Sequence, residues 1–468
     1  MPYKIQFLAI ACFPLSLYAQ MGKLSLTLEE ASNRMNRFNP TMQIAHKAVD
    51  IAKGEQQKLN AFWFPSVNAT GMYVHLSNKI EVKQPLNAFT EPAKEWVQAN
   101  LPNTPLLTSL LDQISNYSLS VPLFQRNLTA MDVNISWPVF TGGKRIYASR
   151  IGKRMVDWAE VDKQETGAFL QVELVEAYYA LRMAKEVAMV QKASYQSLEQ
   201  HYQHAVKMEQ NGFINKAERL FAEVNKQEAK REWESAQKKE EVAQQALCAL
   251  LRMENVEIDP VSPLFLIPTI PDSLYFHDRI GGNYTVNKLS LQESMVDNQL
   301  RISKSAYLPT IALLGKQTLY AHHLPRNLMP RTMIGIGLTW NLFDGLNREA
   351  DVRINRLAKE SLALGKDKAV HDIGVWMKKL YTELQEAQES LSTLQTTIEM
   401  SRELLRIRKK SFEEGMATST EVVDAEVMLS KVQVARLLAC YQLDVSLASL
   451  CTVCGAPELF WKFYSSQK

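Results

Sequence analysis

The side chains of this sequence that could do chemistry are scattered, and few have the spacing that a reaction requires. Cys451 and Cys454 are separated by two residues, which is the spacing of a thiol–disulfide redox motif. Such a motif belongs within a thioredoxin-like alternation of strands and helices, and no such pattern surrounds Cys451. We therefore interpret both cysteines, together with Cys248 and Cys440, as small apolar residues of helices.

Two pairs of histidines are the remaining candidates for metal ligands. His322 and His323 are adjacent, so their side chains point apart in an extended chain. His201 and His204 are three residues apart, and we interpret them as part of a solvated helix surface. The sequence contains no glycine-rich phosphate loop, no metal-ligand spacing and no nucleophile motif. We therefore predict neither an enzyme nor a bound cofactor.

The start of the sequence has the layout of a cleavable secretory signal. Lys4 precedes an apolar stretch over residues 5–17, and Ala19 provides the small residue at which cleavage occurs. We expect residues 1–19 to be a signal peptide, with lipid attachment at Cys12 as the alternative. No later stretch approaches the ~18 uninterrupted apolar residues of a spanning helix, so insertion into a membrane would have to use strands. The net charge of +3 gives no signal for nucleic acid as a partner.

The sequence is built from two copies of one unit. Trp137-Pro138-Val139-Phe140-Thr141-Gly142 matches Trp340-Asn341-Leu342-Phe343-Asp344-Gly345 at a shift of 203 positions, and the same shift carries Gly212 to Gly415. The division that we predict is a first repeat over 20–260, a linker over 261–283, a second repeat over 284–457 and a C-terminal tail over 458–468. The first copy has an additional segment over 75–127, and its prolines predict a long exposed loop.

Each copy contains a long segment without proline that we predict to be helical. Residues 145–211 and 346–414 would each form ~100 Å of helix. Gly212 and Gly415 end these segments and are followed by helix-capping sequences that begin at Asn215 and Thr418. We therefore predict a helical hairpin with its tip at the glycine in each copy. The other predicted helices are the returning arms over 215–253 and 418–454, a helix from Thr27 toward Phe62, and one from about Tyr284 to Ala306.

Four segments alternate apolar and polar residues over ~9–11 positions: Val67–Val74, Met131–Val139, Thr310–Leu319 and Ile334–Leu342. Such strands suit a transmembrane barrel, and they equally suit a half-buried sheet of a soluble protein. Open sheet edges do not exist in hydrocarbon, and four strands cannot close a barrel. Membrane insertion would therefore need two, three or four chains in one barrel.

The order and duplication of these motifs resemble the TolC-like outer membrane efflux protein family. The resemblance spans Leu26 to about Pro457. The residues that carry it are Asn39-Pro40, Pro65, Pro309, Trp137-Pro138-Val139-Phe140-Thr141-Gly142-Gly143, Phe412-Glu413-Glu414-Gly415, Glu421 and Asp424.

The resemblance implies a mainly α fold with a β-barrel part. Duplicated helical hairpins of a homotrimer would form a tunnel in the periplasm, and four strands per chain would form a twelve-stranded barrel in outer membrane lipid. The protein would be a channel subunit that gives passive exit to the substrates of an inner-membrane transporter through a periplasmic adaptor protein, in efflux or type I secretion. The alternative is a coiled-coil structural or adhesive envelope protein that forms no channel.

The resemblance also assigns residues to the two tips. Glu421 and Asp424 would form an acidic pore constriction, and the alternative is that both acids only stabilise a helix N-terminus. Gly212, Glu218, Phe412 and Gly415 would mark the hairpin tips at which the adaptor docks. An arginine of the family latch, two residues after the second glycine, is replaced here by Ala417.

Overall fold

The computed structural model describes residues 22–101, 104–264, 270–322 and 330–465. The predicted signal peptide, Cys12 and His323 lie outside these described residues. The chain forms two compact units. One contains Met1–Lys53, Arg154–Ser294 and Lys359–Lys468, and the other contains Gly54–Lys153 and Met295–Ala358.

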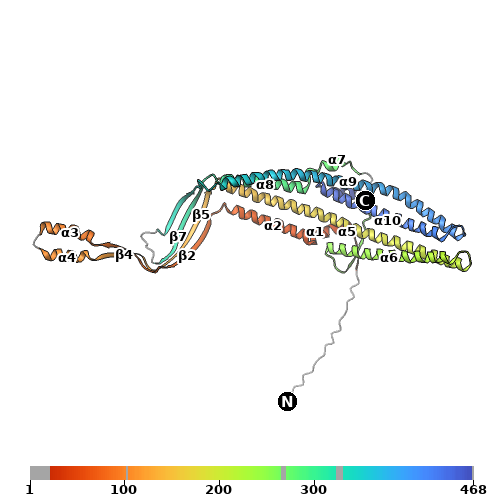
Figure 1. The fold of residues 1–468 in the computed structure, drawn as a ribbon, viewed down its shortest axis with the longest axis horizontal. Helices are drawn as coiled ribbons and strands as arrows, with labels where there is room; N and C mark the ends of the chain where they lie inside the picture. Colours follow the sequence, from red (N-terminus) through yellow and green to blue (C-terminus); the bar gives the residue numbers. More distant parts are fainter. Residues whose placement is uncertain (1–21, 102–103, 265–269, 323–329, 466–468) are drawn as a thin grey trace, which may run out of the picture. The chain divides into compact units, whose positions relative to one another are not determined.

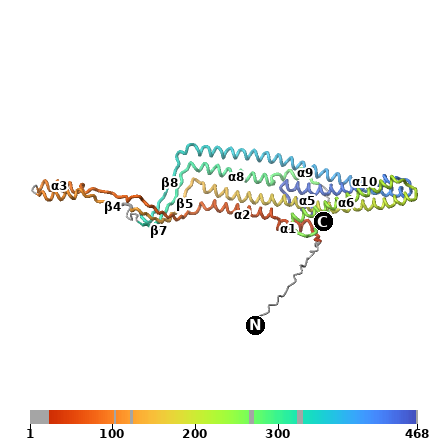
Figure 2. Tube along the Cα trace, turned by 60° about the horizontal axis from the view of Figure 1, so that its bottom comes forward, coloured from red at the N-terminus to blue at the C-terminus, as the bar shows by residue number. Residues whose placement is uncertain are grey.

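Two long helical hairpins dominate the first unit, as predicted (Figure 2). A turn joins helix α5 (Lys144–Gln210) to α6 (Lys216–Leu251) in the first hairpin. A second turn joins α9 (Asn347–Glu413) to α10 (Ser419–Val453) in the second hairpin. Helices α5 and α9 have 67 residues each. Both begin in the second unit, after the strands, and both run to a glycine turn.

The predicted helix from Thr27 toward Phe62 is two helices, α1 (Leu28–Phe38) and α2 (Pro40–Ala61). The residue between them, Asn39, is extended with φ −69° and ψ 126°. The reason is local, because a proline disfavours helical geometry in the residue before it. The other short helix, α8 (Tyr284–Ser305), has nearly its predicted bounds.

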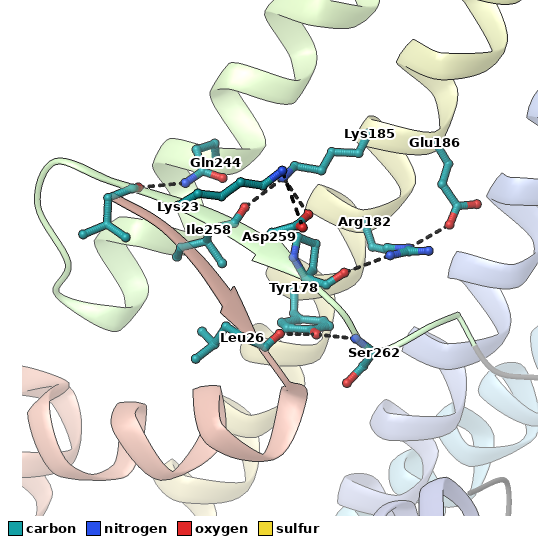
Figure 3. Close-up of polar contacts among 12 residues, drawn as sticks. Lys23, Leu26, Tyr178, Arg182, Lys185, Glu186, Gln244, Ile258, Asp259 and Ser262 are labelled. Atoms are coloured by element: carbon teal, nitrogen blue, oxygen red, sulfur yellow. Dashed lines mark hydrogen bonds and ion pairs between the residues drawn. The ribbon is translucent and has the colours of Figure 1, made fainter. Parts of the chain in front are cut away.

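A small parallel sheet, which the sequence analysis missed, ties the start of the chain to the end of the first hairpin. Strand β1 (Gly22–Leu26) pairs with β6 (Val256–Pro260) beside α5 (Figure 3). Tyr178 of α5 is fully buried, and its hydroxyl donates to the Leu26 carbonyl at 2.7 Å and accepts from the Ser262 amide at 2.9 Å. Lys185 donates to the Ile258 carbonyl at 2.9 Å. The Tyr178 hydroxyl satisfies the buried Ser262 amide, and it shares the Leu26 carbonyl with the Val261 amide, which donates to that carbonyl at 3.2 Å.

Two further segments are more ordered than the sequence predicted. Helix α7 (Ser273–His277) and the 3-10 turn η1 (Ile280–Gly282) lie in the predicted linker. The predicted C-terminal tail begins with helix α11 (Glu458–Ser465), and its Phe460 side chain is fully buried in the core of the first unit. An aromatic residue buried in this way anchors a chain end, because it removes a large apolar area from water.

Helix α10 contains a stretch that could cross a membrane by its length and apolar composition. Half of that stretch is buried against the rest of the chain. A helix that is apolar on all sides is typical of a core as well as of a membrane span.

The second unit contains the four predicted strands in one antiparallel sheet. Its order is β2 (Ser66–His75), β5 (Asn127–Phe140), β7 (Thr310–His322) and β8 (Thr332–Thr339). The central pair, β5 and β7, joins the two halves of the sequence. Within the described residues, β2 and β8 pair on one side only, so each chain leaves two open edges.

The predicted loop over 75–127 is instead a folded extension. Strand β3 (Ile80–Pro85) pairs with β4 (Ser118–Phe124), and this stem carries two helices, α3 (Asn87–Asn100) and α4 (Pro105–Ser115) (Figure 1). Two of the prolines that suggested a loop lie within helices, Pro92 inside α3 and Pro105 at the start of α4. Pro105 is the first residue of α4, where a missing amide hydrogen costs nothing.

Candidate functional site

The two predicted tips have the same backbone geometry. Gly212 and Gly415 adopt φ angles of +78° and +73°. Residues other than glycine adopt this left-handed backbone conformation only at an energetic cost. In both turns the amide of the residue after the glycine donates back into the helix, from Phe213 to the Met208 carbonyl at 2.9 Å and from Met416 to the Ser411 carbonyl at 2.8 Å. This is the Schellman type of helix ending.

The returning helices are capped as the sequence predicts. The Asn215 side chain accepts from the Glu218 amide at 3.0 Å, and the Thr418 hydroxyl accepts from the Glu421 amide at 3.4 Å. A full capping box would also have the glutamate side chain accept from the cap amide, as Glu30 does for Thr27 at 2.9 Å. Glu421 has a different partner.

The carboxylate of Glu421 receives a bond from the guanidinium of Arg408, on α9. Both side chains are about 40% exposed, so water screens this ion pair. Asp424 is exposed, and its position three residues after Glu421 places both acids on one face of α10. Arg408 is thirteen positions before Glu421, and the hairpin turn brings it beside Glu421, so no local pattern in the sequence indicated this pair.

Phe412 is a core residue of the two tips. Its side chain is 1% exposed and packs with Ala205, Ala222 and Val422, which come from both hairpins. The ring of Phe412 is therefore not exposed at the tip surface of the single chain, and its docking role stays a prediction. The exposed apolar side chains at the tips are instead Phe213 and Met416, at 74% and 72% exposure. The sequence could have indicated both exposed residues, since each directly follows the glycine of a predicted tip.

His201 is buried between the two hairpins, which corrects its assignment to a solvated surface. Its exposed fraction is 6%, its ring lies 4.6 Å from that of Phe412, and its Nε2 is 2.7 Å from the Ser419 hydroxyl. Burial, with smaller contributions from His204 and Lys409, lowers the pKa of His201 to about 4. His204 is exposed, as predicted, and lies 4.0 Å from Glu413.

A second polar contact joins the hairpins nearby. Lys409 of α9 lies 3.2 Å from the carboxylate of Glu426, whose side chain is 7% exposed. Ser197 of α5 donates to the same carboxylate and accepts from Lys409 at 2.5 Å. The three groups satisfy one another, and a buried charge requires such partners. The tips of the two hairpins are therefore held together by polar and apolar contacts without the family arginine.

Part of the sequence matches a known family, and the fold is similar to solved structures. Residues 282–456 match the family described as outer membrane efflux protein. No curated protein matches the sequence. Among solved structures, CusC has a TM-score of 0.73 at 14% identity, covering 94% of this chain and 96% of that one. VceC of Vibrio cholerae has a TM-score of 0.72 at 14% identity, covering 92% and 96%.

A third similar structure, the CmeC outer membrane channel of Campylobacter jejuni, has a TM-score of 0.70 at 13% identity over 94% of this chain. Identities this low establish the fold and nothing finer. The family match concerns proteins of the outer membrane, which is the predicted location. The resemblance to the TolC-like outer membrane efflux proteins is thereby confirmed, by the family match over residues 282–456 and by the fold over nearly the whole chain.

Proposed function

We propose that three copies of this chain form a passive exit channel across the outer membrane. The observation that carries the proposal is the four-stranded sheet with its two open edges, β2 and β8. Ile334, Ile336 and Leu338 of β8 are between 63% and 85% exposed in the single chain. Apolar strand faces of this kind suit contact with lipid, and closing the edges in lipid requires further copies. The family resemblance selects three copies and a twelve-stranded barrel.

The test of this assembly is fractionation of cells followed by a mass measurement in mild detergent. We expect the mature protein in the outer membrane fraction, with the mass of three chains. A monomer in the periplasmic fraction would contradict the proposal and favour a coiled-coil structural protein that forms no channel.

The helical hairpins would then line a periplasmic tunnel whose tips receive an adaptor and, through it, an inner-membrane transporter. The tip residues that we assign to docking are Gly212, Glu218 and Gly415, together with the exposed Phe213 and Met416. Apolar side chains at 70% exposure or more on a rigid turn suit a partner surface that buries them. Replacing Phe213 and Met416 by serine should abolish capture of the adaptor while leaving the trimer intact. Undiminished capture would contradict this docking site.

Glu421 and Asp424 would form the acidic constriction of the tunnel. Three copies would bring six carboxylates into one ring. In each copy, the positive charge of Arg408 would neutralise the negative charge of Glu421. The net negative charge of the ring would then come mainly from Asp424, and a ring of this sign favours cations. The double substitution Glu421→Gln with Asp424→Asn should remove cation selectivity in a planar bilayer. Selectivity that survives this change would show that the acids are only helix caps.

A further inference from the structure

The extension on the β3–β4 stem leaves a large apolar surface exposed. Helices α3 and α4 pack against each other through Thr90 and Val97, and Lys94 forms an ion pair with Asp112 across the contact. Outside this contact, six large apolar side chains are 42–74% exposed: Phe89, Trp96, Leu106, Leu107, Leu110 and Ile114. We call them the apolar face of the extension.

Five of the six side chains lie on one side of the helical pair, and Leu106 lies next to Leu110 on the side of α4 that faces away from α3. Phe89, Ala93 and Trp96 follow one another at the spacing of a helix stripe, and so do Leu107, Leu110 and Ile114. Counting about 100° per residue from the α3–α4 contact places both stripes on the same side. Glu91 and Glu95 of α3 fall on the opposite side.

The apolar surface of the extension is as large as the largest apolar patch of an ordinary monomer. Six side chains at these exposures present about 600 Å² of apolar area, the upper end of the ~300–600 Å² that the largest patch of a typical monomer has. Asp112 is the only charged residue in α4, and it is engaged with Lys94. Apolar patches of this size often mark interaction sites.

We infer that the apolar faces of three copies pack on one another as a six-helix cap over the outer mouth of the barrel. The inference rests on the proposed trimer. Strand β2, which ends at His75, is an open edge that must pair with a neighbouring copy, and β3 resumes five residues later at Ile80. The stems of neighbouring copies would therefore rise side by side around one three-fold axis, and apolar faces that turn toward this axis would contact one another.

The charge and the length of the extension disfavour the lipid surface as the cover. Helices that lie on membranes carry lysine and arginine on their polar side, whereas the polar side of α3 carries Glu91 and Glu95. The six residues of β3 span roughly 20 Å, which exceeds the ~5–7 Å of one headgroup layer. The stem is long enough to hold the helices clear of the membrane.

Cysteine cross-linking on intact cells tests this arrangement. Ala93→Cys and Leu110→Cys place a thiol on the apolar face, and Glu95→Cys, on the opposite side of α3, is the matched control. The native Cys248, Cys440, Cys451 and Cys454 lie in the other unit. In the Ala93→Cys and Leu110→Cys variants, a short, membrane-impermeant bismaleimide should link two of the three copies in each assembly. In the Glu95→Cys control it should link no copies.

Two results would overturn the cap. Intact trimers without cross-links at either apolar position would show that lipid or another protein covers the face. Equal cross-linking of all three variants would show that the extensions meet without using the apolar face. The trimer itself is measured separately, by mass in mild detergent, so that failure of the cap and failure of the proposed channel give different results. Loss of the trimer in unsubstituted protein would remove both.

Discussion

Acidification should loosen the joint between the two hairpins, because His201 must remain neutral there. The groups that face it are His204 from its own helix, Phe412 and Lys409 from α9, and the Ser419 hydroxyl from the first turn of α10. None of these is an anion that would stabilise an imidazolium. The first turn of a helix is also the positive end of its dipole, which opposes a further positive charge.

The size of the effect follows from the pKa of His201. A fall from the ordinary value of 6.5 to about 4 corresponds to about 3 kcal/mol, at ~1.4 kcal/mol for each pKa unit. The unfolded or opened chain binds a proton below pH 6.5, whereas the closed joint does not until the pH approaches 4. The stabilisation is therefore complete above pH 6.5 and is lost as the pH falls through this window.

Amide hydrogen exchange in residues 197–205 and 412–426 measures the opening of the joint. In the native chain, the free energy of opening should decrease by up to about 3 kcal/mol between pH 6.5 and pH 4, after correction for intrinsic exchange. His201→Asn should remove most of this dependence, and His204→Asn, which changes an exposed neighbour, should retain it. An equal pH dependence in the native chain and in His201→Asn would refute the reasoning.

Three further substitutions test contacts within the chain. Tyr178→Phe removes the hydroxyl shared by Leu26 and Ser262 and should lower the free energy of unfolding by about 1–3 kcal/mol in denaturant titrations, since the buried Ser262 amide loses its partner while the Leu26 carbonyl keeps the Val261 amide; a change below ~0.5 kcal/mol would contradict this. Gly455→Ala places a Cβ 2.3 Å from the Gly282 carbonyl oxygen at φ +77°, so it should destabilise more than Gly415→Ala, which has φ +73° and no atom within 4 Å; equal effects would show that the φ angle alone matters. Arg408→Gln should expose the charge of Glu421 and increase cation selectivity in a bilayer, whereas Arg406→Gln, which disrupts a surface pair with Glu403, should not; equal selectivity would contradict the placement of Glu421 at the pore.

The long hairpins could be predicted from the sequence because their signals are local and repeated. A proline-free segment, a glycine and a capping residue specify where each helix begins and ends, so residues 145–211 and 346–414 were predicted within one residue of α5 and α9. The strands of the main sheet were found for a similar reason, since alternation over nine or more residues is a signal that neighbouring sequence does not obscure.

The missed features depend on contacts between distant residues. Strands β1 and β6 have five residues each, which is too short for an alternation of apolar and polar residues to identify a strand. They form because they pair with each other. The burial of His201 and the Arg408–Glu421 pair both require two segments to meet across a hairpin or between hairpins. The helices α3 and α4 were hidden by prolines, whose effect depends on where in a helix they fall.

The most direct test of the proposed channel is the current that purified, unsubstituted trimers carry across a planar lipid bilayer. We expect discrete conductance steps, one for each inserted trimer, with cations carrying more of the current than anions. Trimers that insert into the bilayer and carry no ionic current would contradict the account.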